Sequence, residues 1–121
     1  MIDFAKTFDI LMVDEAVRYV GIIDSAGNIV ASKSRGGDMA DDEVFRFDQR
    51  ILKSVLDVEN DIHGKAIRIH TTREKIEQFV YYCDNLIIYV TCDPRIEHKR
   101  LLEISDKIQD IIGQPVETSY V

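Results

Sequence analysis

The fold of this chain is decided by the stretch FVYYCDNLIIYV, Phe79–Val90. Two apolar runs in it flank the polar pair Asp84-Asn85, and both residue types tolerate a positive φ, so we predict a β-hairpin with a two-residue turn. The register that follows places Tyr82 opposite Ile87, Val80 opposite Tyr89, Cys83 opposite Leu86 and Cys92 opposite Glu77. Because every position of both runs is apolar, both faces of the sheet must be covered there, and we expect Phe79–Cys83 and Leu86–Val90 to lie centrally.

Three more strands precede this hairpin in the chain. Val17–Ile23 and Asn28–Ser32 flank Asp24–Gly27, whose small and turn-forming residues suit a hairpin loop. A further strand within Lys65–Thr71 alternates between apolar and polar residues, as expected where one face meets solvent or a partner. We therefore place this strand near an edge of the sheet.

Three amphipathic helices accompany the strands. In the first, the apolar residues recur at three- and four-residue spacing: Phe4, Ala5, Phe8, Leu11 and Met12. The second is long, with Asp41 or Asp42 as its N-cap and an end near Asn60. The third is predicted to begin with Asp93 as N-cap and Pro94 at its first position, and to end at Gly113. Its buried stripe should consist of Leu101, Ile104, Ile108, Ile111 and Ile112.

Together these elements predict one α+β domain over residues 1–113, with a five-stranded antiparallel sheet and helices on both faces. The first and last helices should share one face and the long helix should cover the other. Residues 114–121 show no pairing signal and are expected to form a flexible tail.

Composition excludes several classes of function. The formal net charge of −7 and the pI near 4.9 oppose binding to nucleic acid and to anionic membranes. We expect no membrane insertion, because no apolar stretch approaches the ~20 residues that span a bilayer. The N-terminus does not resemble a secretory signal, and two cysteines make no disulfide framework, so a cytoplasmic protein is expected.

The order of elements over about residues 2 to 113 resembles the roadblock, longin and profilin-like group. Within that group, Tyr19–Ala31, YVGIIDSAGNIVA, is similar to the first hairpin of small archaeal proteins that carry no assigned function. The resemblance implies a sheet order of 2-1-5-4-3. It also implies a homodimeric or heterodimeric platform that binds other proteins, often small GTPases or their regulators.

The long predicted helix offers an independent indication of assembly. Its apolar arc is about 180° wide, at about 100° per residue, which is more than one sheet face needs. We expect the Val44 side to pack on the sheet and a second side to meet another chain. The residues predicted at that interface are Phe45, Asp48, Leu52, Leu56 and Glu59, joined by Arg68 and His70 of the edge strand. Alternatively, the sheet wraps the whole arc, or the C-terminal tail covers it.

The predicted edge strand could extend this contact, because its unpaired backbone groups can bond a symmetry mate. Arg68 and His70 would then reach Asp48 or Glu59 across the dimer. Alternatively, both side chains are exposed to solvent at the edge of the sheet, where their charge prevents aggregation of the protein through this strand.

Candidate chemistry is weak elsewhere. His63, His70 and His98 lack the spacing of a metal site, and no histidine lies in an evident base position beside Cys92, so we predict no metal, no cofactor and no catalytic residue. Ser34-Arg35-Gly36-Gly37 could cradle a phosphate, but acidic residues follow it and a connector is favoured.

The tyrosines leave one further alternative. Tyr81, Tyr82 and Tyr89 could line a ligand pocket between sheet and helix, or they could alternate between the faces as core. The sequence therefore predicts a non-catalytic, homodimeric interaction module, a scaffold or regulator with an unidentified protein partner. A small-molecule sensor is the alternative, and an enzyme is a distant third.

Overall fold

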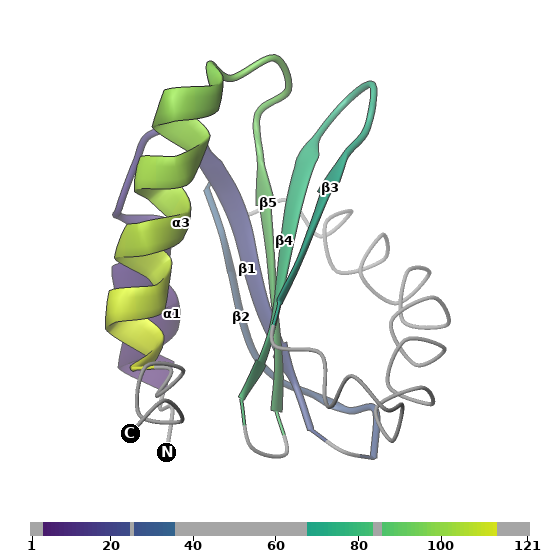
Figure 1. Ribbon diagram of the computed structural model, residues 1–121. Helices are drawn as coiled ribbons and strands as arrows, with labels where there is room; N and C mark the ends of the chain where they lie inside the picture. Colours follow the sequence, from purple (N-terminus) through teal and green to yellow (C-terminus); the bar gives the residue numbers. More distant parts are fainter. Residues whose placement is uncertain (1–3, 25, 36–67, 84–85, 114–121) are drawn as a thin grey trace, which may run out of the picture.

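The computed structural model describes residues 4–24, 26–35, 68–83 and 86–113 (Figure 1). The elements in chain order are α1 (Phe4–Leu11), β1 (Val17–Ile23), β2 (Ile29–Ser34), β3 (Arg68–Thr72), β4 (Glu77–Cys83), β5 (Leu86–Cys92) and α3 (His98–Ile112). The strands form a five-stranded antiparallel sheet in the order β2-β1-β5-β4-β3, which confirms the predicted α+β fold and the predicted sheet order. The predicted long helix and the C-terminal tail lie outside the described residues.

The β4–β5 hairpin has the predicted register. Tyr82 pairs with Ile87, Val80 with Tyr89, Cys83 with Leu86 and Glu77 with Cys92. β5 lies at the centre of the sheet between β1 and β4, and Ile88 and Val90 on it have no solvent-accessible surface. The continuously apolar run thus marks the most deeply buried strand, as expected.

Two hydrophobic clusters occupy the two faces of the sheet. Val20, Tyr81 and Ile88 belong to the cluster that also contains Ile104 and Ile108 of α3. The second cluster, on the other face, consists of Tyr19, Ile23, Val80, Ile87 and Tyr89. Figure 1 shows α1 and α3 side by side against the same face, so the predicted placement of the first and last helices is confirmed.

The predicted apolar stripe of α1 is partly wrong. Phe8 and Met12 are 51% and 56% exposed, whereas Thr7 and Ile10 are buried together with Leu11. Leu11 belongs both to the predicted apolar stripe and to the stripe that is buried in the structure. Hydrophobicity alone predicted the stripe that contains Phe8 and Met12, and those two side chains face outward. The Lys6 ammonium group, which donates a hydrogen bond of 3.0 Å to the Ile111 carbonyl of α3, helps to hold the helix in the observed rotation.

The predicted start of the last helix is also wrong. α3 begins at His98 after the N-cap Glu97, and Asp93 and Pro94 belong to a preceding loop in which Arg95 has a φ of 63°. A residue with a positive φ cannot belong to a right-handed helix, so α3 can begin only after Arg95. The Asp93 N–H donates to the Ala16 carbonyl at 2.9 Å, which ties this loop to the segment before β1. The end was predicted correctly, because Gly113 has the left-handed conformation (φ 70°) of a C-terminal cap.

The buried stripe of α3 follows the predicted spacing. Leu101, Ile104, Ile108 and Ile112 are buried, and Ile111 is partly buried against the same cluster. No helix in the described part of the chain has the length and apolarity that a transmembrane span requires.

Candidate partner-binding edge

Strand β3 forms one end of the sheet. Within the described residues it pairs with β4 alone, in a register that runs from Arg68 opposite Tyr81 to Thr72 opposite Glu77. The predicted edge position is therefore confirmed. A strand at this place presents backbone N–H and C=O groups that a further strand can bond.

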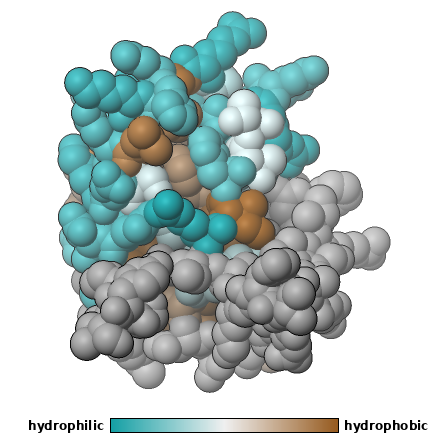
Figure 2. All heavy atoms as spheres, in the orientation of Figure 1, coloured by the Kyte–Doolittle hydropathy of each residue, from teal (hydrophilic) through white to brown (hydrophobic). Residues whose placement is uncertain are grey.

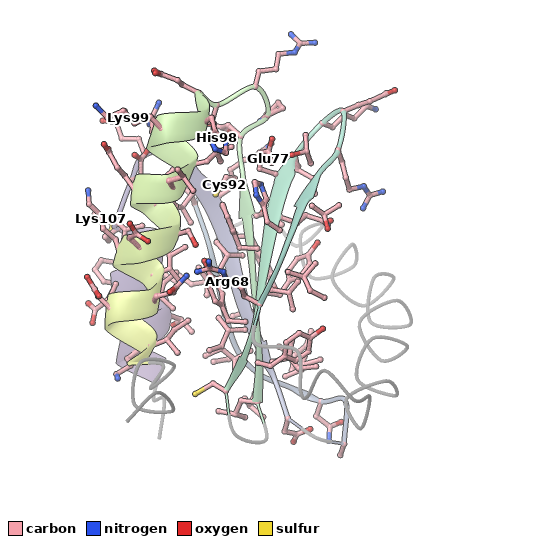
Figure 3. The ribbon with its side chains drawn as sticks, in the orientation of Figure 1. Arg68, Glu77, Cys92, His98, Lys99 and Lys107 are labelled. Carbon is pink, nitrogen blue, oxygen red and sulfur yellow. The ribbon has the colours of Figure 1, made fainter. Side chains whose placement is uncertain are left out.

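The side chains of β3 alternate as predicted. Ile69 packs against the cluster that contains Val80 and Tyr89, whereas His70 lies on the α3 side of the sheet, where its ring stacks on Phe79 at 4.5 Å between centroids. Arg68 is exposed on that same side, and Figure 3 shows it extending from β3 toward α3. The edge thus has an apolar face and a polar face.

Glu77 joins the polar face of β3 to β4. Its side chain is only 5% exposed, and its carboxylate oxygen Oε2 accepts hydrogen bonds from His70 Nε2 at 2.7 Å and from Thr72 Oγ1 at 2.8 Å. Burying a carboxylate is costly unless it is hydrogen-bonded, so these two donors offset its desolvation. One carboxylate therefore holds two alternate residues of the edge strand.

The role of Glu77 was not predicted, although the expected register already placed it opposite Cys92. The sequence did offer a signal for this role, because Glu77 is a charged residue that precedes an apolar run and faces a position expected to be buried. Of the residues predicted at the interface, Arg68 and His70 fall in the described part of the chain. His70 is engaged by Glu77 of its own chain. Phe45, Asp48, Leu52, Leu56 and Glu59 lie outside the described residues.

The three candidate pocket tyrosines lie on different faces. Tyr81 is on the α3 side, where its hydroxyl group contacts Ser105 Oγ at 2.9 Å, and burial raises the pKa of Tyr81 to about 12. Tyr82 and Tyr89 are on the opposite face, where Gln78 Nε2 donates to Tyr89 Oη at 2.7 Å. The three tyrosines therefore do not share one face of the sheet, and the ligand pocket stays a prediction.

The environment of Cys92 does not favour an activated thiol. Cys92 is fully buried, and its desolvation, together with Asp14, Asp93 and Glu77 nearby, raises the pKa of this thiol to about 12. A thiol so disposed is a poor nucleophile at neutral pH. In the part of the chain that the structure describes, no group of three His, Cys, Asp or Glu side chains could hold a metal ion.

Arg35, from the candidate phosphate loop, has a structural role. Its guanidinium group donates to the carbonyl oxygens of Leu11, Asp14 and Val17, the last through Nε at 2.8 Å. These bonds tie the end of α1 and the start of β1 to the end of β2. Because the guanidinium already has three acceptors, Arg35 is poorly placed to bind an anion, while Gly36 and Gly37 lie outside the described residues.

A depression of about 500 Å³ lies beside the loop before α3. It is lined by Glu15, Ala16, Asp93, Pro94, Arg95, Ile96, Glu97 and Arg100. Arg100 donates two hydrogen bonds, from Nε and Nη2, to the two oxygens of the Asp14 carboxylate, and these bonds lower the pKa of Asp14. The lining carries charges of both signs, so the depression favours no class of ligand.

Figure 2 shows a mostly hydrophilic surface over α3, with few hydrophobic side chains.

Comparison with solved structures identifies the fold. A roadblock/LC7 domain from Streptomyces avermitilis superposes with a TM-score of 0.66 at 8% identity, covering 92% of this chain and 95% of that one. MglB from Myxococcus xanthus superposes with a TM-score of 0.64 at 13% identity, covering 91% of this chain and 94% of that one. The gliding protein MglB from Thermus thermophilus gives 0.67 at 12% identity, with coverage of 89% and 83%.

The chain has the roadblock/LC7 fold. The resemblance inferred from the order of elements is thereby confirmed at the level of structure. No protein-family model matches the sequence, and no curated protein matches it either. One structure with the same fold shows MglB in a tetrameric arrangement. The likeness to small archaeal proteins stays a prediction.

Proposed function

We propose that this chain is a non-catalytic, homodimeric interaction module of the cytoplasm, a scaffold or regulator that binds a second protein. The observation that carries the proposal is the position of β3 at the end of the described sheet, where β3 pairs with β4 alone among the described strands. Such an edge is a template for pairing with another chain unless it is blocked. The likeness to MglB, reported in one structure as a tetramer, supports assembly through protein contacts.

The class of partner follows from the resemblance. Roadblock-like proteins often bind small GTPases or their regulators, and we extend that class of partner to this chain. Phe45, Leu52 and Leu56 are proposed as the apolar part of the dimer interface, with Asp48 and Glu59 as its charged part. Arg68 and His70 would contribute from the adjoining edge.

The test of the proposal is the oligomeric state. Light scattering over a range of concentrations should give a dimer for the natural chain and a folded monomer for the double variant Leu52→Asp with Leu56→Asp. The matched control is Leu102→Asp, because Leu102 is 53% exposed on α3 and the same change there should leave the dimer intact. A natural chain that is monomeric at high concentration refutes the proposal.

A further inference from the structure

Strand β2 lies at the end of the sheet opposite to β3. Among the described strands it pairs with β1 alone. The Arg35 N–H donates to the Arg18 carbonyl at 2.8 Å, next to the pair of Ser34 with Tyr19, so the pair of Arg35 with Arg18 is of the bonded kind. Opposite pairs in an antiparallel ladder alternate between bonded and non-bonded. Ser34 and Ser32 therefore direct their N–H and C=O groups away from β1, toward the edge of the sheet.

Helix α1 runs beside this part of β2. It packs on β1 and β2 (Figure 1), and the guanidinium group of Arg35 donates to the Leu11 carbonyl near the end of the helix. On the side of α1 that faces α3, Lys6 donates to the Ile111 carbonyl. Phe8 follows Lys6 by two residues and projects about 200° around the helix from it, at about 100° per residue. The side of α1 that carries Phe8 thus faces away from α3, toward the edge at β2.

This side of α1 is apolar and exposed. Phe8 and Met12, one helical turn apart, are 51% and 56% exposed. Lys33 of β2 is exposed on the same face of the sheet, because it lies opposite Val20, which belongs to the cluster that α1 and α3 cover. Together these groups form a surface that we name the α1–β2 ledge, which consists of Phe8, Met12, Ser32, Lys33 and Ser34.

We propose that the α1–β2 ledge binds an extended segment of a partner protein, which adds to the sheet as a further strand beside β2. The backbone groups of Ser32 and Ser34 bond this segment, as in other cases of recognition by strand addition. Alternate side chains of a strand point to the same face of the sheet. On the α1 face, apolar side chains of the segment cover Phe8 and Met12, and a carboxylate meets Lys33.

The charge of the ledge favours such a segment over a second copy of β2. Lys33 is the only charged residue of β2, IVASKS, so another β2 strand would bring a lysine and no carboxylate. Opposite charges across a strand pair are favourable, and like charges are unfavourable. The irregular pairing near Ile22 and Ile23 restricts the straight part of β2 to residues 31–34, so the bound segment is short. The site lies at the far end of the sheet from β3, and it therefore does not depend on the proposed homodimer.

A displayed library of random short peptides tests the proposal. Selection on the natural chain, with counter-selection on the variant Phe8→Ser with Met12→Ser, should enrich peptides that carry a carboxylate two residues from an apolar side chain. Both replaced side chains are exposed, so the variant should fold, which circular dichroism can verify. If the natural chain enriches no peptide beyond the counter-selection, the proposal is overturned.

Charge reversal tests the contact at Lys33. The enriched peptide should bind Lys33→Glu about tenfold more weakly than the natural chain, and replacing its carboxylate residue with lysine should restore the affinity. The control Lys75→Glu makes the same change in the exposed β3–β4 turn and should leave the affinity unchanged. Equal affinity for Lys33→Glu and the natural chain overturns the proposal. A natural chain that is monomeric refutes the proposed homodimer but leaves this site intact.

Discussion

The contact between Glu77 and His70 should be measurable as a coupling energy. His70 Nε2 lies 2.7 Å from the Glu77 carboxylate, which is 5% exposed, while the His70 side chain is 37% exposed. A hydrogen bond to a charged group contributes about 1.5–3 kcal/mol, and partial exposure of His70 reduces this. We expect Glu77→Gln and His70→Gln each to lower the free energy of unfolding by about 1–2 kcal/mol.

The double variant should cost less than the sum of the single variants, by about 1 kcal/mol, because the second change removes a contact that is already lost. The assay is urea unfolding at fixed protein concentration, since assembly makes apparent stability depend on concentration. His98→Gln is the matched control, because His98 is exposed at the start of α3 and no effect is expected. Strictly additive single variants would refute the role given to this contact.

Three further predictions concern stability and thiol chemistry. The pKa of Tyr81 is raised from 10.0 to about 12 by burial, so the folded state holds a proton that the unfolded state releases, and the free energy of unfolding should fall from about pH 10 upward. Tyr81→Phe should flatten this slope in alkaline urea titrations, and an unchanged slope would contradict the assignment. Cys92, with no accessible surface, should resist alkylation at pH 8 until the protein unfolds, while the partly exposed Cys83 should react first. Equal rates in mass-spectrometric mapping would count against the burial of Cys92. Arg35→Ala should lower the free energy of unfolding by about 2 kcal/mol, because the carbonyl groups of Leu11, Asp14 and Val17 lose a charged donor. Lys33→Ala, two residues earlier in β2, serves as the control, and similar losses in both variants would argue against the role of Arg35.

The parts of the fold that the sequence predicted well are those set by local pattern. The apolar run Leu86–Val90 marked the central strand, and the pair Asp84-Asn85 set a register that the structure reproduces at Cys83, Leu86 and beyond. Side-chain period is two in a strand, so one correct turn determines every facing pair. The alternation between apolar Ile69 and polar His70 has the same period of two, and it predicted the edge position of β3.

The parts that were predicted wrongly depend on contacts between distant residues. The rotation of α1 is stabilised by the bond from Lys6 to Ile111, more than a hundred positions away, and no periodicity reveals it. Asp93 had the residue type of an N-cap, but its N–H bonds the distant Ala16 carbonyl in a loop where Arg95 has a positive φ, and α3 begins only at His98. The role of Glu77 was missed because it depends on hydrogen bonds to two residues across a hairpin, His70 and Thr72.

Amide exchange along β3, followed residue by residue by NMR, tests the proposed assembly most directly. The N–H groups of Ile69 and Thr71 bond β4 and should be protected at every concentration, whereas those of Arg68, His70 and Thr72 face the open edge. We predict that the three edge amides exchange rapidly in dilute protein and become protected as the concentration rises through the dimer dissociation constant. Rapid exchange of the three at concentrations where light scattering finds a dimer would contradict pairing along β3.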